Sequence, residues 1–463
     1  MQNFTIRDVL KATDGKLISG DMDQLISSIS TDSRTLEKDD FFVALIGDKF
    51  DGHDFIPQAM SKGAMGFLIS KDVNNLFLSF LGGADTSAPN IILVDDTLKA
   101  LGDIAKAYRL EYNIPIIGIT GSNGKTTTKD MITNLLRRRY NILSNKGNLN
   151  NAIGLPLTIF NFTSDHEIGV LEMGTGSPGE MSWLVEMAHP NVAVVTNVGP
   201  THLEFFETMD AVAEEKGLLV EVAGSAVLNA DDPRVAGMSK RTKGEVIYYG
   251  IENGDVRASE IMQNNEGKSI FTLSTNSDQA RIHLQSLGNH NIYNALAASA
   301  TGLMFDMTLQ EIGDSLQDFT DVPMRMQRRI INGISIIDDT YNSNLGSLKA
   351  ALNYLSSAKC KGRKIAVLGD MLELGTRSEE LHRKAGRYVA QGDIDLLITA
   401  GKDAEIIYDS ALKTGFPKEK AITCESNLEA ADHLRWEANE DDLVLIKGSR
   451  GMKMEEIIKL LEE

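Results

Sequence analysis

The chain has 463 residues, too many for one compact core, so we expect two to four domains. Apolar residues make up 42% of it and charged residues 24%, as in ordinary soluble globular proteins, which argues against disorder and fibre formation. The formal net charge of −19 excludes a general binder of nucleic acid or of anionic membranes, because such binding needs a basic surface.

The two cysteines, Cys360 and Cys424, are far apart and form no CxxC pair. The sequence therefore suggests neither a disulfide framework nor a structural zinc site, and we expect both thiols in the core. The N-terminus lacks the layout of a signal peptide, and no apolar stretch approaches the length of a membrane span. These features predict a cytoplasmic protein.

Residues 1–113 are predicted to form a small α/β domain. They contain a strong apolar strand within Asp40–Gly47 and a helix at Ala59–Ala64, with turn residues around both. No phosphate-binding loop occurs in this segment. The boundary with the next domain is expected at Asn113 and Pro115, since proline disfavours a continuing helix.

The clearest motif of the chain lies between an apolar, β-branched strand and a stretch with helical periodicity. In such a loop the backbone N–H groups converge on phosphate, Lys125 reaches the terminal phosphates and the Thr126 hydroxyl ligates Mg²⁺. The strict Walker pattern places its first glycine at position 119, which is isoleucine here, so a glycine-rich turn without nucleotide remains the alternative. The motif comprises Thr120, Gly121, Ser122, Asn123, Gly124, Lys125, Thr126 and Thr127.

From residue 114 to residue 323, apolar runs alternate with helical patterns. This spacing predicts right-handed crossovers and a mostly parallel sheet. Residues 246–286 are richer in β-forming residues and predict an antiparallel extension. The strands are expected at 168–173, 192–196 and 226–229, and the helices at 126–140, 181–188, 209–222 and from 289 onward.

The alternation restarts at residue 324 and predicts a second doubly wound sheet, of the Rossmann-like kind but without a phosphate-binding motif. Its strands are expected at 334–337, 364–368, 396–400 and 443–446, and its helices at 345–355, 379–389, 404–412 and the C-terminus.

Polar residues follow the central strands, where ligands of open parallel sheets bind. Glu172 ends one strand, at a position from which a carboxylate can hold Mg²⁺, although it can also cap the next helix. His202 follows the next strand and is either a ligand or a structural histidine. Lys216 lies on a helix beside two glutamates, where a solvated lysine is the alternative.

Three further groups suit a nucleotide. Asn291 and Asn294 lie on one face of a predicted helix and can pair with an adenine edge. Arg325, at the junction of two domains, can reach a phosphate. The stretch Asp338–Asn344 offers carboxylates to ribose hydroxyls and a stacking ring in Tyr341, unless it is an ordinary polar loop.

With these motifs in order, the chain resembles the Mur ligases, the ATP-dependent ligases of bacterial cell-wall precursors. Its passages are most similar to those of members that join D-alanyl-D-alanine to UDP-MurNAc-tripeptide, and the similarity extends from near residue 30 to near residue 455. The passages that carry this closer resemblance are Asp32–Arg34, Phe41–Leu45, Asp51–His53, Gly147–Pro156, Asp338–Asn342, Leu368–Gly375 and Lys447–Arg450.

The resemblance implies three domains and two cofactors, ATP and Mg²⁺. Residues 1–113 would bind the UDP-sugar, residues 114–323 would form the central P-loop ATPase, and residues 324–463 would form the C-terminal Rossmann-like ligase domain. The activity would be formation of a peptide bond through an acyl phosphate, in peptidoglycan synthesis and hence in cell-wall biogenesis, cell shape and cell division. A monomer without nucleic-acid or membrane partners is expected.

The resemblance also implies roles for individual residues. The expected catalytic residues are Lys125, Glu172, His202, Lys216 and Arg325, with Thr126, Glu172 and His202 holding Mg²⁺ and Lys216 matching a lysine that is carbamylated in related enzymes. Asn291 and Asn294 would contact adenine, and Asp339 the ribose. Ser33 and Arg34 match the region that contacts the uridine end, and Asn148, Asn150 and Asn151 would line the peptide channel.

Two alternative interpretations remain open. Another Mur ligase or folylpolyglutamate synthase shares the central motifs, although the Ser33–Arg34 and Asp51–His53 segments argue against the folate enzyme. A nucleotide-binding switch that hydrolyses ATP slowly would use the same loop. The switch interpretation assigns no function to a third α/β domain or to Lys216.

Overall fold

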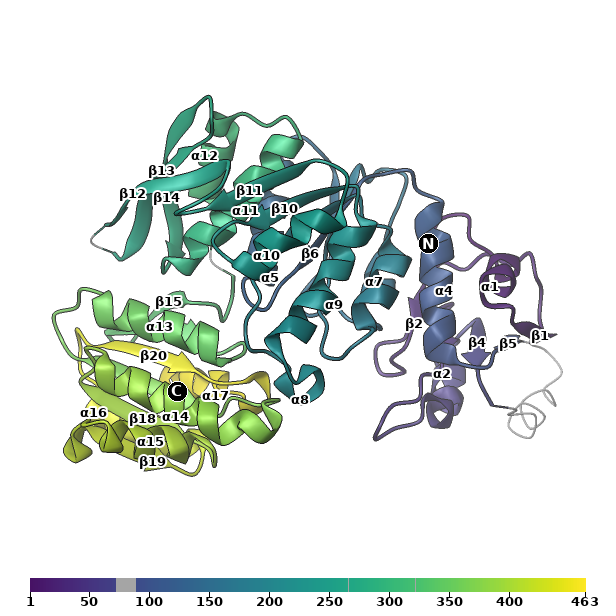
Figure 1. The fold of residues 1–463 in the computed structure, drawn as a ribbon. Helices are drawn as coiled ribbons and strands as arrows, with labels where there is room; N and C mark the ends of the chain where they lie inside the picture. Colours follow the sequence, from purple (N-terminus) through teal and green to yellow (C-terminus); the bar gives the residue numbers. More distant parts are fainter. Residues whose placement is uncertain (72–88, 265, 321) are drawn as a thin grey trace. The chain divides into compact units, whose positions relative to one another are not determined.

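The computed structural model describes residues 1–71, 89–264, 266–320 and 322–463. Within these ranges the strands form three sheets, of five, nine and six strands, which follow one another along the chain (Figure 1). By contacts the chain divides into two compact units: the first comprises Met1–Gly118, Arg139–Thr175 and Gly179–Val192, and the second comprises Ile119–Arg138, Gly176–Pro178 and Ala193–Glu463. Within the described ranges, no helix has the length and apolar character needed to cross a membrane.

The first sheet has the strand order β1-β5-β4-β3-β2, in which only β1 runs antiparallel to its neighbour. The long helix α4 (Thr97–Leu110) begins at Asp96, whose carboxylate accepts hydrogen bonds from two backbone N–H groups of the first turn. The remaining elements are β1 (Lys16–Ser19), β2 (Ile29–Ser30), β3 (Phe41–Val43), β4 (Gly66–Ile69), β5 (Asn90–Leu93), α1 (Ile6–Thr13) and α2 (Ile56–Ser61).

The second sheet has the order β14-β13-β12-β11-β10-β9-β6-β8-β7, so that β6 (Ile116–Thr120) lies between β9 and β8. The antiparallel extension predicted for residues 246–286 holds for β12, β13 and β14, whereas the strand at its start, β11, is parallel to both β10 and β12. The other strands are β7 (Ile142–Ser144), β8 (Ile168–Glu172), β9 (Val192–Val195), β10 (Ser225–Asn229), β11 (Val246–Gly250), β12 (Val256–Gln263), β13 (Lys268–Ser274) and β14 (Gln279–Leu287). The helices are α5 (Lys125–Leu136), α6 (Gly154–Ile159), α7 (Glu180–Ala188), α8 (Leu203–Phe206), α9 (Met209–Val222), α10 (Pro233–Gly237), α11 (His290–Met304) and α12 (Leu309–Asp318).

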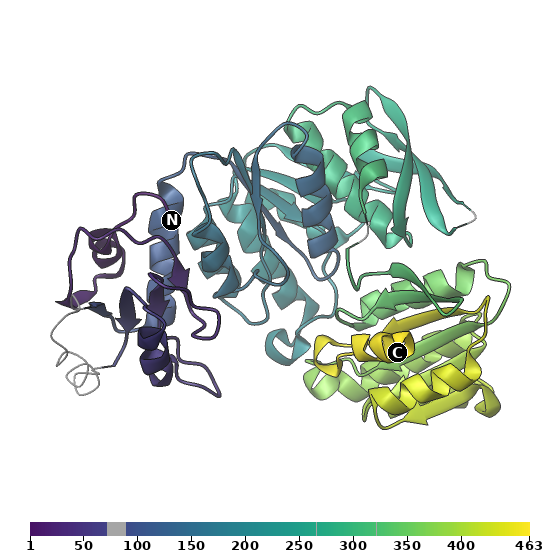
Figure 2. The same ribbon diagram turned by 180° about the vertical axis from the view of Figure 1, so that it is seen from behind.

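The third sheet has the order β15-β16-β20-β17-β18-β19 and is parallel except for β15. Alternate residues of its strands, such as Ala366 and Val367, enter two different apolar clusters, as expected for a sheet covered on both faces. The helices α13, α14 and α15 cover one face and α16 and α17 the other (Figures 1 and 2). The elements are β15 (Gln327–Ile331), β16 (Ile334–Asp339), β17 (Lys364–Gly369), β18 (Leu396–Ala400), β19 (Ala421–Cys424), β20 (Leu443–Lys447), α13 (Leu345–Ser357), α14 (Ser378–Gln391), α15 (Ala404–Lys413), α16 (Asn427–Glu437) and α17 (Glu455–Glu462).

Several expected boundaries move. The helix expected at Ala59–Ala64 is α2, which begins earlier, at Ile56, and ends at Ser61. The strand expected within Asp40–Gly47 is reduced to β3, three residues long. The expectation for the cysteines holds for Cys424, which is buried, whereas Cys360 is only half-buried.

Candidate active site

The loop after β6 has a backbone that only glycine accommodates at two positions. Gly121 and Gly124 have φ angles of +146° and +82°, in the region that side chains rarely adopt. A Cβ atom at Gly121 would lie 1.9 Å from Oγ1 of Thr196, and one at Gly124 would lie 2.3 Å from Oδ1 of Asn294. The glycines therefore fix the loop against its neighbours as well as bending it.

The segment after β9 braces this loop. The backbone N–H groups of Ser122 and Asn123 donate to the backbone O and the Oδ1 of Asn197, at 2.9 and 3.0 Å. The Ser122 hydroxyl donates to the Gly199 carbonyl at 3.1 Å. Inside the loop, Lys125 Nζ donates to the Gly121 carbonyl at 2.7 Å, which folds the ammonium group back over the turn. Hydrogen bonds within the protein thus hold the loop in shape.

Arg325 reaches the same loop from the start of the third segment. Its Nη2 donates to Oγ1 of Thr126 at 3.0 Å, and its guanidinium carbon lies 4.1 Å from the centre of the Tyr341 ring. Its Nε is buried and has no hydrogen-bond partner among the described residues. Nearby, Asn344 Nδ2 donates to Oδ1 of Asn123 at 2.7 Å. The sequence predicts Arg325 and Tyr341 for the site, but it does not indicate that they stack on each other.

His202 pairs with a carboxylate that the sequence does not single out. Its Nδ1 lies 2.9 Å from Oε2 of Glu373, and this hydrogen bond holds the pKa of Glu373 below its usual range. Both residues have positive φ angles, of +52° and +61°. Because Nδ1 faces a carboxylate, Nε2 is the ligand atom left for a metal, the arrangement common among metal-binding histidines. Glu373 does lie within Leu368–Gly375, one of the passages that carry the family resemblance, so that passage could have indicated Glu373 as a site residue.

Lys216, on α9, is 3% exposed and therefore is not the solvated lysine of the alternative interpretation. Burial, and secondarily the positive charge of Lys125, lower its pKa to about 7. At neutral pH a large share of the amine is consequently unprotonated and nucleophilic. This is the protonation state that reaction with carbon dioxide requires.

Glu172, in the first compact unit, ends β8 and is 2% exposed. Its Oε1 accepts from Nδ2 of Asn150 at 2.7 Å, while its Oε2 is buried without a hydrogen-bond partner among the described residues. Asn145 holds the backbone, accepting from the Glu172 N–H and donating to its carbonyl, each at 2.9 Å. An orphaned carboxylate oxygen of this kind fits a hard cation such as Mg²⁺.

Asn291 and Asn294 serve contacts within the protein. Asn291 Nδ2 donates to the Leu287 carbonyl at 2.8 Å, and Asn294 Nδ2 donates to Oδ1 of Asn291, also at 2.8 Å. Oδ1 of Asn294 accepts from the Thr128 hydroxyl at 3.2 Å, which ties α11 to α5. Both residues are 4% exposed, and Asn294 lies against Gly124 of the phosphate loop. Their contact with adenine remains a prediction.

Asp339 ends β16 in an ion pair. Its Oδ2 lies 2.6 Å from Nζ of Lys447, and the two side chains are 13% and 2% exposed. The neighbouring Asp338 accepts from the Thr340 hydroxyl at 2.6 Å, and burial raises its pKa. Of the two carboxylates, Asp339 therefore has the more accessible oxygens, although its assignment to ribose stays a prediction.

The residues expected to bind the sugar nucleotide and the peptide all lie in the first unit. Ser33 is buried and donates to Oε1 of Gln58 at 2.8 Å. Arg34 is exposed and forms a forked pair with Asp32, whose pKa its hydrogen bonds lower to about 2. Oδ1 of Asn151 accepts from the backbone N–H groups of Ile153 and Gly154 just before and at the start of α6, and Asn148 is exposed.

The second unit contains the phosphate loop, His202, Lys216, Asn291, Asn294, Arg325 and Asp339. Glu172 belongs to the first unit, on the strand that neighbours β6 in the sheet order.

Three family models match the chain in succession. Residues 25–109 match the Mur ligase family catalytic domain, residues 119–302 the Mur ligase middle domain, and residues 324–450 the Mur ligase glutamate ligase domain. Two curated relatives carry the name UDP-N-acetylmuramoyl-tripeptide–D-alanyl-D-alanine ligase. The Bacillus subtilis relative is 36% identical over 99% of this chain and 98% of its own, and the Escherichia coli relative 32% identical over 100% and 99%.

Solved structures agree with the sequence relatives. MurF from Acinetobacter baumannii superposes with a TM-score of 0.88 at 29% identity, covering 99% of both chains. MurF from Thermotoga maritima, solved in complex with ADP, gives 0.81 at 29% identity and covers 94% of this chain and 97% of its own. A folylpolyglutamate synthase from Mycobacterium tuberculosis, at 16% identity and a TM-score of 0.63, shares the fold alone.

Proposed function

The chain belongs to the Mur ligase family, and on that premise we propose how its residues divide the work of the reaction. The protein is an ATP-dependent ligase, using Mg²⁺, that adds D-alanyl-D-alanine to UDP-N-acetylmuramoyl-tripeptide in peptidoglycan synthesis. The observation that carries the residue roles is the cationic phosphate loop, where Lys125, Thr126 and Arg325 converge.

The three sheets support three domains with boundaries at residues 113/114 and 323/324. All strands of the first sheet lie in residues 1–113, those of the second in 114–323 and those of the third in 324–463. We assign the UDP-sugar to the first domain, ATP to the second, and the closing ligase surface to the third. Ser33 and Arg34 contact the uridine end, and Asn148, Asn150 and Asn151 line the peptide channel.

In the first step the γ-phosphoryl group of ATP passes to the terminal carboxylate of the tripeptide, giving an acyl phosphate and ADP. The acceptor is already anionic, so the chain has to neutralise charge rather than remove a proton. Lys125 and the guanidinium of Arg325 do so at the phosphates. Bound Mg²⁺, held by Thr126, Glu172 and His202, would add Lewis-acid polarisation of the phosphoryl group.

In the second step the amine of D-alanyl-D-alanine attacks the acyl phosphate, and phosphate leaves as the amide forms. Asn291 and Asn294 support the nucleotide loop and the adenine, and Asp339 holds the ribose. Lys216 is carbamylated in this proposal, because a buried amine with a pKa near 7 becomes an anion suited to the metal site only after that modification.

We also assign the reaction to a monomer in the cytoplasm. The net charge of −19 supports the monomer, because like charges on two copies of the chain oppose self-association.

The test is phosphate release from ATP and Mg²⁺ with UDP-MurNAc-tripeptide, assayed with and without D-alanyl-D-alanine. We expect full phosphate release only when both UDP-MurNAc-tripeptide and D-alanyl-D-alanine are present. A UDP-MurNAc-pentapeptide should then be detected by mass. Phosphate release that needs neither UDP-MurNAc-tripeptide nor D-alanyl-D-alanine would instead identify a nucleotide-driven switch. Parallel reactions with tripeptides ending in L-lysine and in meso-diaminopimelate would identify the third residue of the natural substrate.

A further inference from the structure

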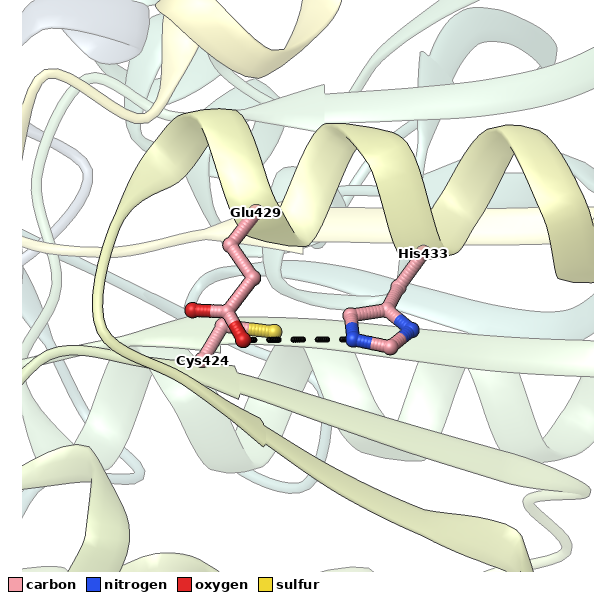
Figure 3. A group of neighbouring side chains, drawn as sticks. All are labelled: Cys424, Glu429 and His433. Carbon is pink, nitrogen blue, oxygen red and sulfur yellow. Dashed lines mark ion pairs between the residues drawn. The ribbon is translucent and has the colours of Figure 1, made fainter.

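A thiol, a carboxylate and an imidazole meet at the edge of the third sheet, and none of them takes part in the reaction proposed above. Cys424 is the last residue of the edge strand β19, and Glu429 and His433 follow on α16. Because Glu429 and His433 are four residues apart, they share one face of the helix. The sulfur, oxygen and nitrogen ligand atoms all lie within 4.8 Å of one another (Figure 3).

The carboxylate of Glu429 is already oriented. Its Oε2 accepts a hydrogen bond from the Glu425 backbone N–H at 2.7 Å, and its Oε1 lies 4.0 Å from Nε2 of His433. Figure 3 shows both helix side chains extending toward Cys424. Outer hydrogen bonds of this kind fix the ligands of metal sites, because they leave one oxygen directed at the ion.

The elements that carry the three groups are also fixed. Cys424 pairs with Ala400 in the sheet, and the Ser426 hydroxyl caps α16 by accepting from the Glu429 N–H at 3.2 Å. Asn427 ties the first helical turn to the chain before α17 by donating to the Met452 carbonyl at 2.8 Å. A metal would therefore meet a largely preformed site.

The three side chains differ in exposure, and two of them can carry a negative charge. Cys424 is 3% exposed, whereas the side chains of Glu429 and His433 are 44% and 43% exposed, so an ion can arrive from solvent. A thiolate and a carboxylate together balance a divalent charge. We propose that Cys424, Glu429 and His433 bind a zinc-type divalent transition metal, with water in the fourth position.

Binding would proceed by exchange of a proton for the metal. The S–H bond of Cys424 breaks, the proton leaves to solvent, and a sulfur–metal bond forms without any change of oxidation state. The ion would then join the edge strand β19 to α16.

The ligand sulfur makes the site distinguishable from the magnesium site, which has only oxygen and nitrogen ligands. We expect Co²⁺ added to the full-length protein to give a sulfur-to-metal charge-transfer absorption. The band should vanish in Cys424→Ser and persist in Cys360→Ser, the matched control at the other cysteine. His433→Ala should weaken Co²⁺ binding by at least about tenfold, while His283→Ala, at an exposed histidine of β14, should not.

A second measurement guards against a Cys424 variant that folds poorly. Zn²⁺ should raise the melting temperature of the wild type by binding its folded state, and this rise should be absent in His433→Ala, a change at a half-exposed position. Lack of a charge-transfer band, or a Zn²⁺ response that survives His433→Ala, would overturn the proposal. The rate of ligation with Mg²⁺ should be equal in wild type and His433→Ala. A negative result in the Co²⁺ and Zn²⁺ tests would therefore overturn the metal site and leave the proposed function intact.

Discussion

The ring of Tyr341 packs against the guanidinium of Arg325, with its centre 4.1 Å from the guanidinium carbon. Cation–π contacts contribute about 0.5–2 kcal/mol, so Tyr341→Ala is expected to lower kcat/KM for ATP by about 2- to 30-fold. Tyr341→Phe keeps the ring and should stay close to wild type in the same steady-state assay. Equal losses in both variants would assign the effect to the hydroxyl and contradict this role of the ring.

Lys125 supplies the positive charge closest to the turn of the phosphate loop. Removing one such charge-stabilising donor typically lowers turnover by about 100- to 1,000-fold, which is our expectation for Lys125→Ala in the ligation assay. The exposed Lys243 provides the control, since Lys243→Ala should be neutral. Near-normal ligation by Lys125→Ala, in a variant that melts like wild type, would remove the loop from the mechanism.

Lys216 predicts a pH-dependent stability. Its pKa is about 7 in the folded state, whereas a lysine without this burial has its ordinary pKa of 10.5 in the unfolded chain. Between these values the unfolded state binds more protons, so stability rises with pH across that window. In carbon-dioxide-free buffer, Lys216→Met should be more stable than wild type below pH 7, and the gap should narrow as the pH approaches 10.5. Urea titrations at several pH values measure the difference in unfolding free energy between the variant and wild type. A difference that does not change with pH would contradict the lowered pKa of Lys216.

At the scale of elements, the phosphate loop depends on glycine for two separable reasons, backbone conformation and space. Gly415 has a φ angle of +105°, and a Cβ atom added there would have no neighbour within 4 Å, whereas one at Gly124 would meet Asn294. Gly415→Ala should therefore cost only the conformational strain, about 1 kcal/mol. Gly124→Ala should cost more, and should also weaken ATP binding, as denaturant unfolding and nucleotide titration would measure. Equal losses of unfolding free energy in the two variants would show that the Asn294 side chain moves aside without a cost in stability.

Most buried strands and amphipathic helices could be predicted from the sequence. In these elements the spacing of apolar residues matches the positions that are buried in the structure. The predicted helix at 209–222 is α9 as it stands, and the predicted strand at 396–400 is β18. Among the elements missing from the prediction are β19 and α16, most of whose residues are partly or fully exposed and give a weak pattern. Also missing is α4, which is defined by a capping aspartate more than by a long apolar run.

The chemistry of the candidate site could be predicted where it lies next to a motif in the chain. Lys125, Thr126 and Glu172 could be placed from their strands and loops alone. The pairing of His202 with Glu373, and the stacking of Tyr341 on Arg325, join residues far apart in sequence. No local pattern encodes such pairs, since they depend on how separate sheets are connected and packed.

For the whole molecule we expect substrate binding to draw the domains together, since ligands that join separate domains commonly close them. Small-angle scattering should show a smaller radius of gyration with a non-hydrolysable ATP analogue and UDP-MurNAc-tripeptide than without them. The Lys125→Ala variant, which we expect to bind the analogue less tightly, is the control and should change less. Identical dimensions with and without ligands would contradict closure.

The sheet order has a consequence for synthesis on the ribosome. Each sheet is complete before the next begins, so the chain can fold from its N-terminus one sheet at a time. Within the second sheet, however, β6 lies between β8 and β9, and the loop after β6 is braced by Asn197 and Gly199. A nascent chain that ends before Val192 therefore carries the whole phosphate motif in sequence but lacks β9 and the bracing residues Asn197 and Gly199. Nucleotide affinity should consequently appear only after those residues have left the exit tunnel, and not when the phosphate motif itself emerges.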